Sequence, residues 1–460
     1  MQFFQFLTSA VDIAPPWVRF GIGRGIRSRL FYAPLASVGE PQSVSELPVA
    51  PAAHAKSSEV TAALLTRSLG TGGVEAVVAT LARGLPQHGI GTLVVCESGG
   101  MTAESLRAEG IQVIESSDAS SMAEVLRSVP QPVVVQLHNA PDHAIQACRI
   151  TGTSYMPVIH TTDINLTPDR WAFESQVVQS APVSVAVSDT VRDYFLSHAP
   201  QSAESSFEVV PNGAESVPFA SEELEGARIT LSRVLDVDLT RALVFTCLAR
   251  YDMQKNIPGL VASVLAAADL REDLHLVVAG PVQDWLEYRF ADAIRRGHPA
   301  GHRIHLMGAG SARGLLAASD AFILDSFFEG WPVAATEAVL AGLPVVAAEV
   351  GGAAELVGPG EERGRIFPNP AISPQATTLK RIQRARRRSG DQVNKSDLRA
   401  AVLEICDDIQ EWRARRFELA LEAQSWLAPE IMVRAHADLL RDVVRDRSND
   451  ATLPRREYPQ

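Results

Sequence analysis

The sequence predicts an α/β protein of two Rossmann-like domains, each with a parallel β-sheet, that face one another across a cleft. Three observations favour this fold class. The chain has 460 residues, which is too long for one ordinary core, short apolar runs alternate with helical stretches, and the alternation occurs in two series. Because ligands of such sheets bind beyond the carboxyl ends of the strands, we expect the chemistry in the cleft.

The first series of predicted strands begins at Val60 and the second at Ala242. Strands of the first series are expected at 60–69, 91–96, 112–114, 133–137, 156–160 and 183–187, with helices such as 74–85 between them. Strands of the second series are expected at 242–248, 274–279, 303–307, 321–324 and 344–348. The boundary falls near residues 216–240, where Ser, Glu and Gly accumulate, and two helices are expected later, at 397–424 and 428–446.

Composition excludes several classes of protein. The formal net charge is −12 and the pI is near 5.5, which argues against nucleic acid as the main partner because phosphate neutralisation needs clustered Lys and Arg. No apolar run approaches membrane-spanning length. The four cysteines lie far apart and form no C-x-x-C pair, so neither a zinc site nor a disulfide framework is indicated and a cytoplasmic location fits best.

Two segments are rich in basic residues. Residues 1–35 interleave aromatic side chains with arginines, and we expect them to pack against the body of the protein, with peripheral contact at the inner face of a membrane as the alternative. Residues 380–388 form a basic helical run, for which a solvated helix face is the ordinary interpretation. Contact with an anionic acceptor or with lipid head groups is the alternative for this run.

Two acids eight positions apart, Glu329 and Glu337, follow a short predicted strand. Pro332 suits a first helical turn, which places Glu329 on a loop and Glu337 inside the helix. The first-turn N–H groups and the helix dipole favour a phosphate there, and carboxylate oxygens accept hydrogen bonds from vicinal sugar hydroxyls. The pattern therefore indicates a nucleotide-sugar site, against the alternative of an amphipathic helix with two solvated glutamates.

Three glycine-rich stretches compete for a nucleotide. Gly21–Gly25 follows no predicted strand and is interpreted as a turn. Gly308–Gly314 lies between a strand and a helix, but no acid ends a following strand about twenty residues on, which disfavours a hydride-transfer enzyme. Gly70–Glu75 also links a strand to a helix, where tandem glycines allow a ligand or another domain to approach the backbone closely, unless they form only a tight turn.

Five motifs occur in order along the chain: Gly72-Gly-Val-Glu75, Val209-Val-Pro-Asn-Gly213, the run from Cys247 to Leu260, the E-x7-E element Glu329–Glu337, and the run from Ala341 to Glu355. Together they resemble the motifs of the family 4 retaining glycosyltransferases of the GT-B fold, also called glycosyl transferases group 1. The resemblance extends from about residue 58 to residue 445. It implies an acceptor-side domain at 58–225, a donor-binding domain at 240–395 and C-terminal helices at 396–447, the last of which returns to the first domain. Residues 1–57 are then an extension and linker, and 448–460 a loose tail.

The resemblance also implies roles for individual residues. Arg250 and Lys255 would bind the diphosphate of the donor, Glu329 the transferred sugar, and Glu337 the ribose hydroxyls. The backbone amides of the segment after Glu329 would bind phosphate, and Gly72 and Gly73 of the first domain would allow the phosphate to approach closely. The residues expected in these binding roles are Gly330, Trp331, Pro332, Val333, Gly72 and Gly73.

His160 matches a position where the family often has a histidine close to the reacting sugar, although a histidine after an apolar strand is more often a packing residue. His138 is a weaker candidate. No obvious nucleophile stands out in the first domain, so the resemblance favours same-face departure and attack. Asp236-Val-Asp238 is interpreted as a surface turn, and we expect no metal and no cofactor because Arg and Lys are available for the leaving diphosphate.

The sequence thus predicts an enzyme that moves a sugar from a nucleoside-diphosphate sugar to an acceptor, such as a lipid-linked or surface glycan, with retention of anomeric configuration. The alternative is a non-catalytic protein that binds a nucleotide sugar or a partner on the same fold. The base and sugar of the donor and the identity of the acceptor do not follow from one sequence.

Overall fold

The computed structural model describes residues 59–70, 72–215, 218–371, 377–386 and 391–450. Its residues form two compact units. The expectations for residues 1–57, including the basic aromatic segment 1–35 and the glycines at 21–25, lie outside the described residues. Most of the expected tail at 448–460 does so too, and its first three residues are helical.

The unit that contains most of the N-terminal half also includes the chain from Leu427 onward. Its seven strands pair in the order β3-β2-β1-β4-β5-β6-β7 and all pairs are parallel. The strands are β1 (Val60–Ser68), β2 (Ile90–Ser98), β3 (Val113–Glu115), β4 (Val133–His138), β5 (Ser154–Ile159), β6 (Ser184–Ala186) and β7 (Phe207–Val209). The helices are α3 (Gly73–Gly84), α4 (Met101–Ala108), α5 (Ala119–Ser128), α6 (Asp142–Thr151), α7 (Pro168–Gln179), α8 (Asp189–His198) and α18 (Pro429–Asp450), with short 3-10 helices at Leu85–His88 and Pro200–Ser202.

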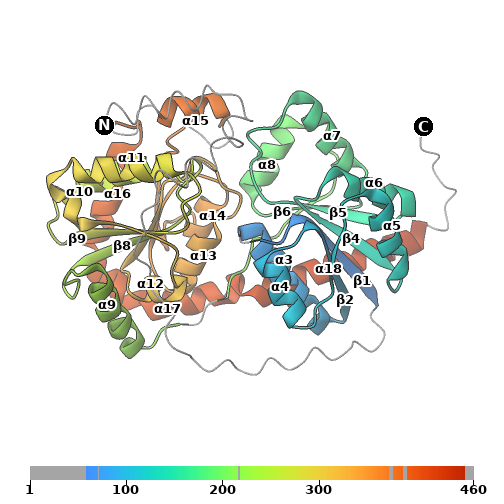
Figure 1. Ribbon diagram of the computed structural model, residues 1–460, viewed down its shortest axis with the longest axis horizontal. Coiled ribbons are helices and arrows are strands. Elements are labelled where there is room, and N and C mark those ends of the chain that lie inside the picture. The colour runs from blue at the N-terminus through green and yellow to red at the C-terminus, as the bar shows by residue number, and fades with distance from the viewer. Residues whose placement is uncertain (1–58, 71, 216–217, 372–376, 387–390, 451–460) are drawn as a thin grey trace. The chain divides into compact units, whose positions relative to one another are not determined.

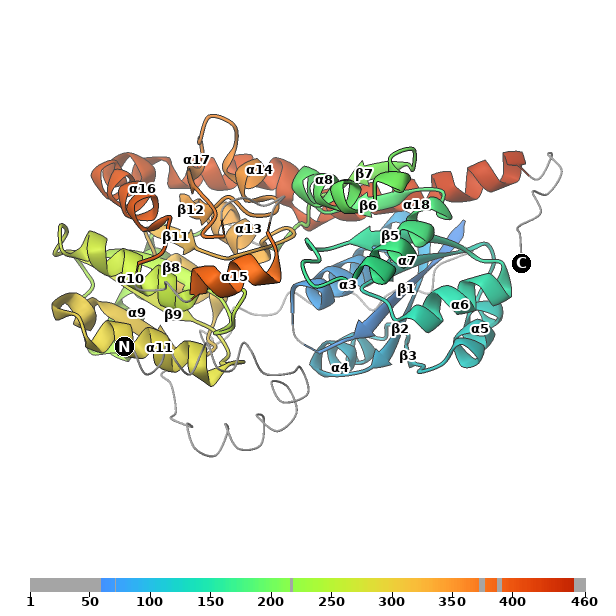
Figure 2. The ribbon, with the colours of Figure 1, turned by 90° about the horizontal axis from the view of Figure 1, so that it is seen from above.

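Two apolar cores cover the two faces of this sheet. Strand β1 is buried along most of its length, as expected for a central parallel strand with helices on both sides. Residues of α3 and α18 share one core with β1, and residues of α5 and α6 share the other. Figure 2 shows α5 and α6 on one side of the sheet and α18 on the opposite side.

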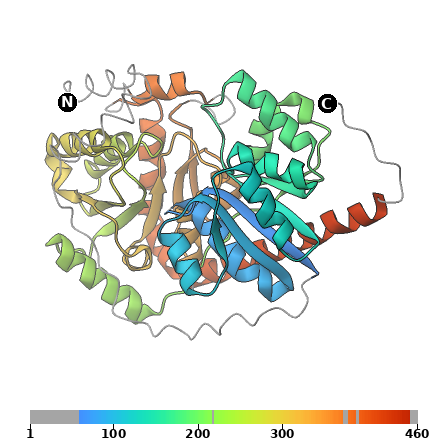
Figure 3. The ribbon, with the colours of Figure 1, turned by 45° about the vertical axis from the view of Figure 1, so that its right-hand side comes forward.

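The closing helix α18 belongs to this unit through its apolar face. Met432, Val433 and Leu440 are buried in the same core as β1 and α3. A Cβ atom on Gly213 would lie 2.9 Å from Cα of Pro429, so the glycine of the Val-Pro-Asn-Gly motif allows the start of α18 to approach the chain after β7. Figure 3 shows the end of α18 extending past the strands of its sheet.

The second unit includes residues 163–165 and the described residues from 214 to 426. Its six strands are parallel and pair in the order β10-β9-β8-β11-β12-β13. They are β8 (Leu243–Leu248), β9 (Leu274–Ala279), β10 (Ile304–Met307), β11 (Ala321–Leu324), β12 (Val345–Ala348) and β13 (Gly364–Phe367). The helices are α9 (Ser221–Leu235), α10 (Ile257–Ala268), α11 (Trp285–Arg296), α12 (Ala312–Ala317), α13 (Val333–Leu340), α14 (Ala353–Val357), α15 (Leu379–Arg386), α16 (Lys395–Asp407) and α17 (Ile409–Leu427), with a 3-10 helix at Pro299–Arg303.

Helices again cover both faces of the sheet. Figure 1 shows α10 and α11 on one side of β8 and β9, and α9 and α12 on the other. Two Rossmann-like units with parallel sheets confirm the predicted fold class. Each predicted strand is present with ends within two residues of those expected.

Three features differ from the sequence-based expectations. The short edge strands β7 and β13 were not predicted. The boundary region near 216–240 contains the helix α9. The single helix expected at 397–424 is wrong, because the structure has two helices that separate at Asp408.

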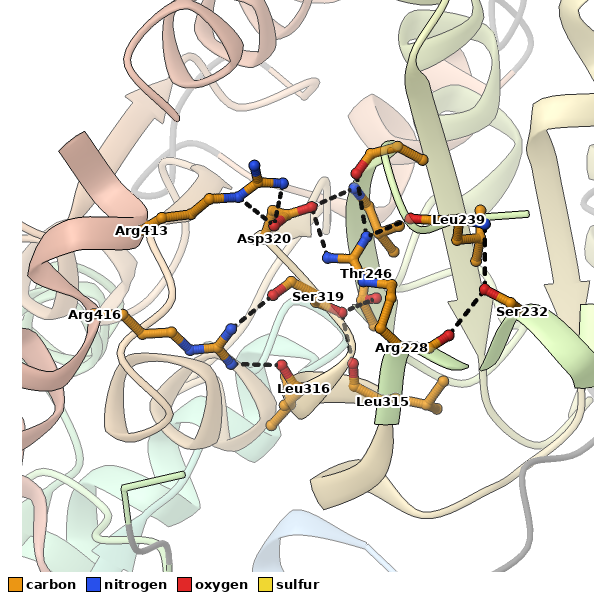
Figure 4. A network of polar contacts seen from close by, with 12 residues as sticks. Arg228, Ser232, Leu239, Thr246, Leu315, Leu316, Ser319, Asp320, Arg413 and Arg416 are labelled. Atoms are coloured by element: carbon orange, nitrogen blue, oxygen red, sulfur yellow. Dashed lines mark hydrogen bonds and ion pairs between the residues drawn. The ribbon is translucent and has the colours of Figure 1, made fainter. Parts of the chain in front are cut away.

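Asp320 lies directly before β11 and connects three elements of the second unit (Figure 4). Its carboxylate accepts hydrogen bonds from Arg228 of α9 at 2.9 Å, from the backbone N–H of Val244 at 2.8 Å and from Arg413 of α17 at 2.9 Å. Arg416 donates to the carbonyl of Ser319 next to it. Because Asp320 is 6% exposed and bonded in three directions, its role is structural.

The basic run is only partly a solvated face. Lys380 and Arg384 are exposed, but Ile382 is buried, and Arg386 is buried in an ion pair with Glu287 of α11. Between residues 59 and 450, within the described ranges, no helix is both long and apolar enough to cross a membrane.

Candidate functional site

The loop after β8 carries Arg250 and Lys255. Asp252 organises this loop, because its carboxylate accepts from Arg250 Nε at 2.9 Å and from the backbone N–H of Lys255 at 3.2 Å. Arg250 Nη2 also donates to Gln254 Oε1 at 3.3 Å. The loop ends at Asn256, whose positive φ of 48° is a left-handed conformation that a non-glycine residue rarely adopts.

The loop after β11 brings Glu329 to Lys255. Lys255 Nζ lies 2.5 Å from Glu329 Oε1, and the two side chains are 16% and 8% exposed. Gln254 Nε2 donates to the carbonyl of Phe328 at 2.9 Å and to Glu329 Oε2 at 3.3 Å. The contact follows from the topology, because β8 and β11 are neighbours and parallel, so their carboxyl ends lie side by side.

Helix α13 begins directly after this loop. Pro332 is the residue that precedes its first turn, so the helix begins one residue later than expected. The indole N–H of Trp331 donates to Thr336 Oγ1 at 2.8 Å, and its ring packs edge-on against Trp426. The side chain of Trp331 therefore stabilises the start of the helix, and a ligand-binding role would fall to its backbone N–H.

A second loop fixes the turn at Gly330. The carbonyl of Gly330 accepts from the N–H of Gly352 at 2.7 Å. Gly351 has φ of +47°, and a Cβ atom at this position would overlap the carbonyl oxygen of Gly330. Glycine is therefore required at Gly351 both by its backbone conformation and by the close approach of the two loops.

Glu337 lies inside α13 and is the acid that the site leaves unpaired. Its side chain has no hydrogen bond or ion pair with any residue that the structure describes. Burial raises the pKa of its carboxyl from 4.5 to about 7. A half-buried carboxylate that has no donor of its own can accept hydrogen bonds from a bound ligand.

Sequence reasoning missed Asp325, which lies just after β11. Its carboxylate is fully buried and accepts from Asn256 Nδ2 at 2.9 Å, Gln392 Nε2 at 2.7 Å and Asn394 Nδ2 at 3.0 Å. Burial raises its pKa to about 7. Because Asn256 follows Lys255 directly, this network fixes the end of the loop that carries the cation. The residue type alone gave no signal, since the amide partners at 392 and 394 are remote in sequence.

The remaining predicted residues belong to the N-terminal unit. Gly72 precedes α3 in an extended conformation and Gly73 is its first residue, while the carboxylate of Glu75 turns back to accept from Ser68 Oγ at 3.1 Å. His160 follows β5 and is 7% exposed, with Nε2 at 2.9 Å from Nδ1 of His138. The structure thus gathers Arg250, Lys255, Glu329, Glu337 and the segment 330–333 in one unit, and Gly72, Gly73 and His160 in the other.

The described residues contain no group of three or more His, Cys, Asp or Glu side chains placed to hold a metal ion. Asp238, of the one Asp-x-Asp sequence, accepts from the backbone and side chain of Thr240 in an exposed turn. That the chain needs no metal and no cofactor stays a prediction.

Two Rossmann-like units, each with a sheet of parallel strands, and polar side chains at the strand ends of the second unit are typical of the GT-B class. The fold resembles that of Anabaena HepE in a crystal structure with UDP and glucose, with a TM-score of 0.66, 16% identity, and coverage of 83% of this chain and 99% of HepE. It also resembles sucrose-phosphate synthase from Thermosynechococcus elongatus, with a TM-score of 0.64, 15% identity, and coverage of 84% and 99%.

Sequence comparison gives the family. The model of Glycosyltransferase Family 4 matches residues 71–216, and that of Glycosyl transferases group 1 matches residues 238–393. The chain belongs to the group 1, family 4 glycosyltransferases. TuaC of Bacillus subtilis strain 168, a glycosyltransferase assigned to teichuronic acid biosynthesis, is 26% identical over 245 residues. That match spans 51% of this chain and 58% of TuaC, so little more than half of the relative is covered.

Proposed function

We propose that the protein is a glycosyltransferase that moves a sugar from a nucleoside-diphosphate sugar to a glycan or lipid-linked acceptor, with retention of anomeric configuration. One observation carries the proposal: the ion pair of Lys255 and Glu329 lies at the start of α13, and Glu337 in the same helix is an unpaired acid among the described residues.

The cations would serve the leaving group. As the bond between the anomeric carbon and the diphosphate oxygen breaks, negative charge grows on the diphosphate, and Lys255 and Arg250 can stabilise that charge without a metal ion. The backbone N–H groups at the start of α13 add a second set of donors and the positive end of the helix dipole. Both cations and the helix start belong to one unit, so the donor half of the site is built on a single sheet.

The acids would serve the hydroxyl groups. In the ligand-free chain Glu329 Oε1 is paired with Lys255, so a diphosphate that takes the lysine would release this oxygen to accept from the hydroxyls of the transferred sugar. Glu337 would accept from the ribose hydroxyls. In the absence of the donor, Glu329 thus occupies the position of the diphosphate next to Lys255, and Lys255 occupies the position of the sugar hydroxyls next to Glu329.

Uridine diphosphate is the first nucleotide to test. HepE was crystallised with UDP and with UDP-glucose, and the fold of this chain is similar to that protein's. The proposed acceptor class and the proposed retention of configuration rest on the resemblance to the family. Retention is tested by NMR of the anomeric proton of the product, since an inverted product would refute that part of the proposal.

The first prediction concerns Lys255. Incubation with a panel of nucleoside-diphosphate sugars and glycan acceptors should release nucleoside diphosphate, and Lys255→Ala should lower kcat by about a hundredfold, the scale reported for loss of one preorganised charge-stabilising contact. Arg296→Ala is the matched control, because Arg296 is an exposed arginine of the same unit, paired with Asp292. Its turnover should equal that of the wild type.

Lys255→Gln separates chemistry from folding, because glutamine can still donate a hydrogen bond to Glu329 while it removes the charge. Both variants should be compared at matched fractions folded by thermal unfolding. Turnover of Lys255→Ala within a few-fold of the wild type would refute the role assigned to the lysine. Absence of nucleotide binding and of release with every donor would favour a partner-binding protein on this fold.

A further inference from the structure

A buried chain of four polar side chains runs through the N-terminal unit. His160 Nε2 lies 2.9 Å from His138 Nδ1, His138 Nε2 lies 3.2 Å from Gln136 Oε1, and Gln136 Nε2 lies 3.2 Å from Nδ1 of His436. These residues are between 0% and 7% exposed. Gln136 and His138 lie on the same face of β4, His160 follows β5, and His436 comes from α18.

The amide of Gln136 sets the direction of the whole chain. Its oxygen can only accept, so His138 carries a proton on Nε2 and presents a lone pair on Nδ1. That lone pair accepts from His160, which therefore carries its proton on Nε2. On the other side, the amide nitrogen can only donate, so Nδ1 of His436 is an acceptor. One fixed amide thus selects a single tautomer for each of the three rings.

The three rings are neutral at pH 7. Burial lowers the pKa of His160 to about 3, lowers that of His436 to about 4, and holds that of His138 well below its ordinary value. His436 lies between Val433 and Ala437 along α18, and both of these residues are buried in the core of the unit. The closing helix of the chain therefore contributes a fixed end to this hydrogen-bond chain.

His160 ends the chain with one nitrogen unused. Its Nδ1 has no hydrogen-bond partner among the described residues, and it is not one of their fully buried unpartnered polar atoms, so a ligand can reach it. The geometry leaves this nitrogen as an acceptor.

We propose that Gln136, His138 and His436 are positioning residues that hold His160 in the neutral Nε2–H tautomer, so that its Nδ1 accepts a hydrogen bond from a hydroxyl group of a bound sugar. The inference rests on the proposed function for the identity of that ligand. A sugar hydroxyl that donates to Nδ1 keeps its own lone pairs for other donors, and its orientation is then fixed by the protein rather than by water.

The tautomers can be measured without any substrate. The full-length protein, labelled with nitrogen-15 in its 11 histidines, gives ring nitrogen shifts that separate N–H from lone-pair nitrogens, and a His138→Asn variant assigns the signals. Neutral rings with protonated Nε2 at both His138 and His160 at pH 7 are expected. Protonated Nδ1 on His138, or a cationic ring at either position, would overturn the proposal.

Activity tests the positioning role. Gln136→Leu and His436→Leu should each lower kcat on the order of tenfold, the scale of one hydrogen bond, with the donor KM unchanged because the donor cations lie in the other unit. His436→Asn should restore most of kcat, since its side-chain oxygen can accept from Gln136. His275→Leu is the control, because His275 is a buried histidine paired with His305 in the second unit.

Unchanged kcat in Gln136→Leu, or a loss in His436→Asn as large as in His436→Leu, would overturn the positioning role. Failure of the wild type to turn over any donor would contradict the proposed function instead, and the ring nitrogen shifts would still decide whether the chain has the stated direction. Where a leucine variant does not fold, the wild-type shifts keep the proposal falsifiable.

Discussion

At Glu337 the stability of the fold and the proposed function favour opposite charge states. Its carboxyl is half-buried, has no partner among the described residues, and has a pKa raised to about 7 by burial. The neutral form contributes stability that is fully present below the ordinary pKa of 4.5 and is lost as the pH rises through about 7. The anion that a ribose would need is therefore the form that the ligand-free fold tolerates least.

Glu337→Gln should raise the free energy of unfolding at pH 8 by roughly 1 to 3 kcal/mol and change it little at pH 4.5. The same variant should weaken UDP binding at pH 8 on the order of tenfold, because an amide has a single acceptor oxygen for two hydroxyls. Urea unfolding and calorimetry at the two pH values measure both effects. Parallel stability curves for the two proteins between pH 4.5 and 8 would show that Glu337 is not the titrating group.

For individual residues, the sequence predicted which positions belong to the site better than it predicted the contacts of their side chains. Lys255 and Glu329 were each assigned to a ligand by motif resemblance, and the structure pairs them with each other. The pairing could not be predicted because it depends on which strands are neighbours in the sheet. Trp331 was grouped with the binding residues, whereas its indole bonds within the helix start, a contact set by the local turn.

Among the elements, the Asp325 network explains how the loop after β8 is held. Three amide groups, from Asn256, Gln392 and Asn394, converge on one carboxylate. These hydrogen bonds connect the start of α10 and the segment before α16 to the residue that follows β11. A loop that must present a charged side chain gains precision when its ends are fixed in this way.

Asp325→Ala should remove the acceptor that three buried amide groups share and destabilise the second unit by about 3 kcal/mol, although each amide keeps a second acceptor. The donor KM should rise, since Lys255 is no longer held next to a fixed Asn256. Asp397→Ala serves as the control, because Asp397 is exposed in the first turn of α16. Chemical unfolding and steady-state kinetics measure the two effects, and equal behaviour of the two variants would contradict the assigned role.

The apolar strands within each sheet were predictable, and two short edge strands were not. Strands such as β1 and β9 are mostly apolar runs, which local sequence defines. Strands β7 and β13 have only three and four residues and complete the sheet edges, so their pairing depends on tertiary context. The break at Asp408 was missed because the helical pattern continues across it.

For the whole molecule, the arrangement predicted from alternating strands and helices is the one observed within each unit. The return of the last helix to the first unit, which the resemblance implied, has a physical basis in the apolar face of α18 and in the glycine at 213 that admits its start. His436 on that helix could not be connected to His160 from sequence, because only the packing of α18 against β4 brings them into one chain.

We expect a diphosphate to replace Glu329 as the partner of Lys255, and a crystal structure of the protein with UDP would show whether it does. A phosphate oxygen should lie within hydrogen-bond distance of Lys255 Nζ and of the first amides of α13, ribose hydroxyls should contact the carboxylate of Glu337, and the ion pair between Lys255 and Glu329 should be broken. Nucleotide bound elsewhere, with that ion pair intact, would show that Lys255 does not bind the diphosphate.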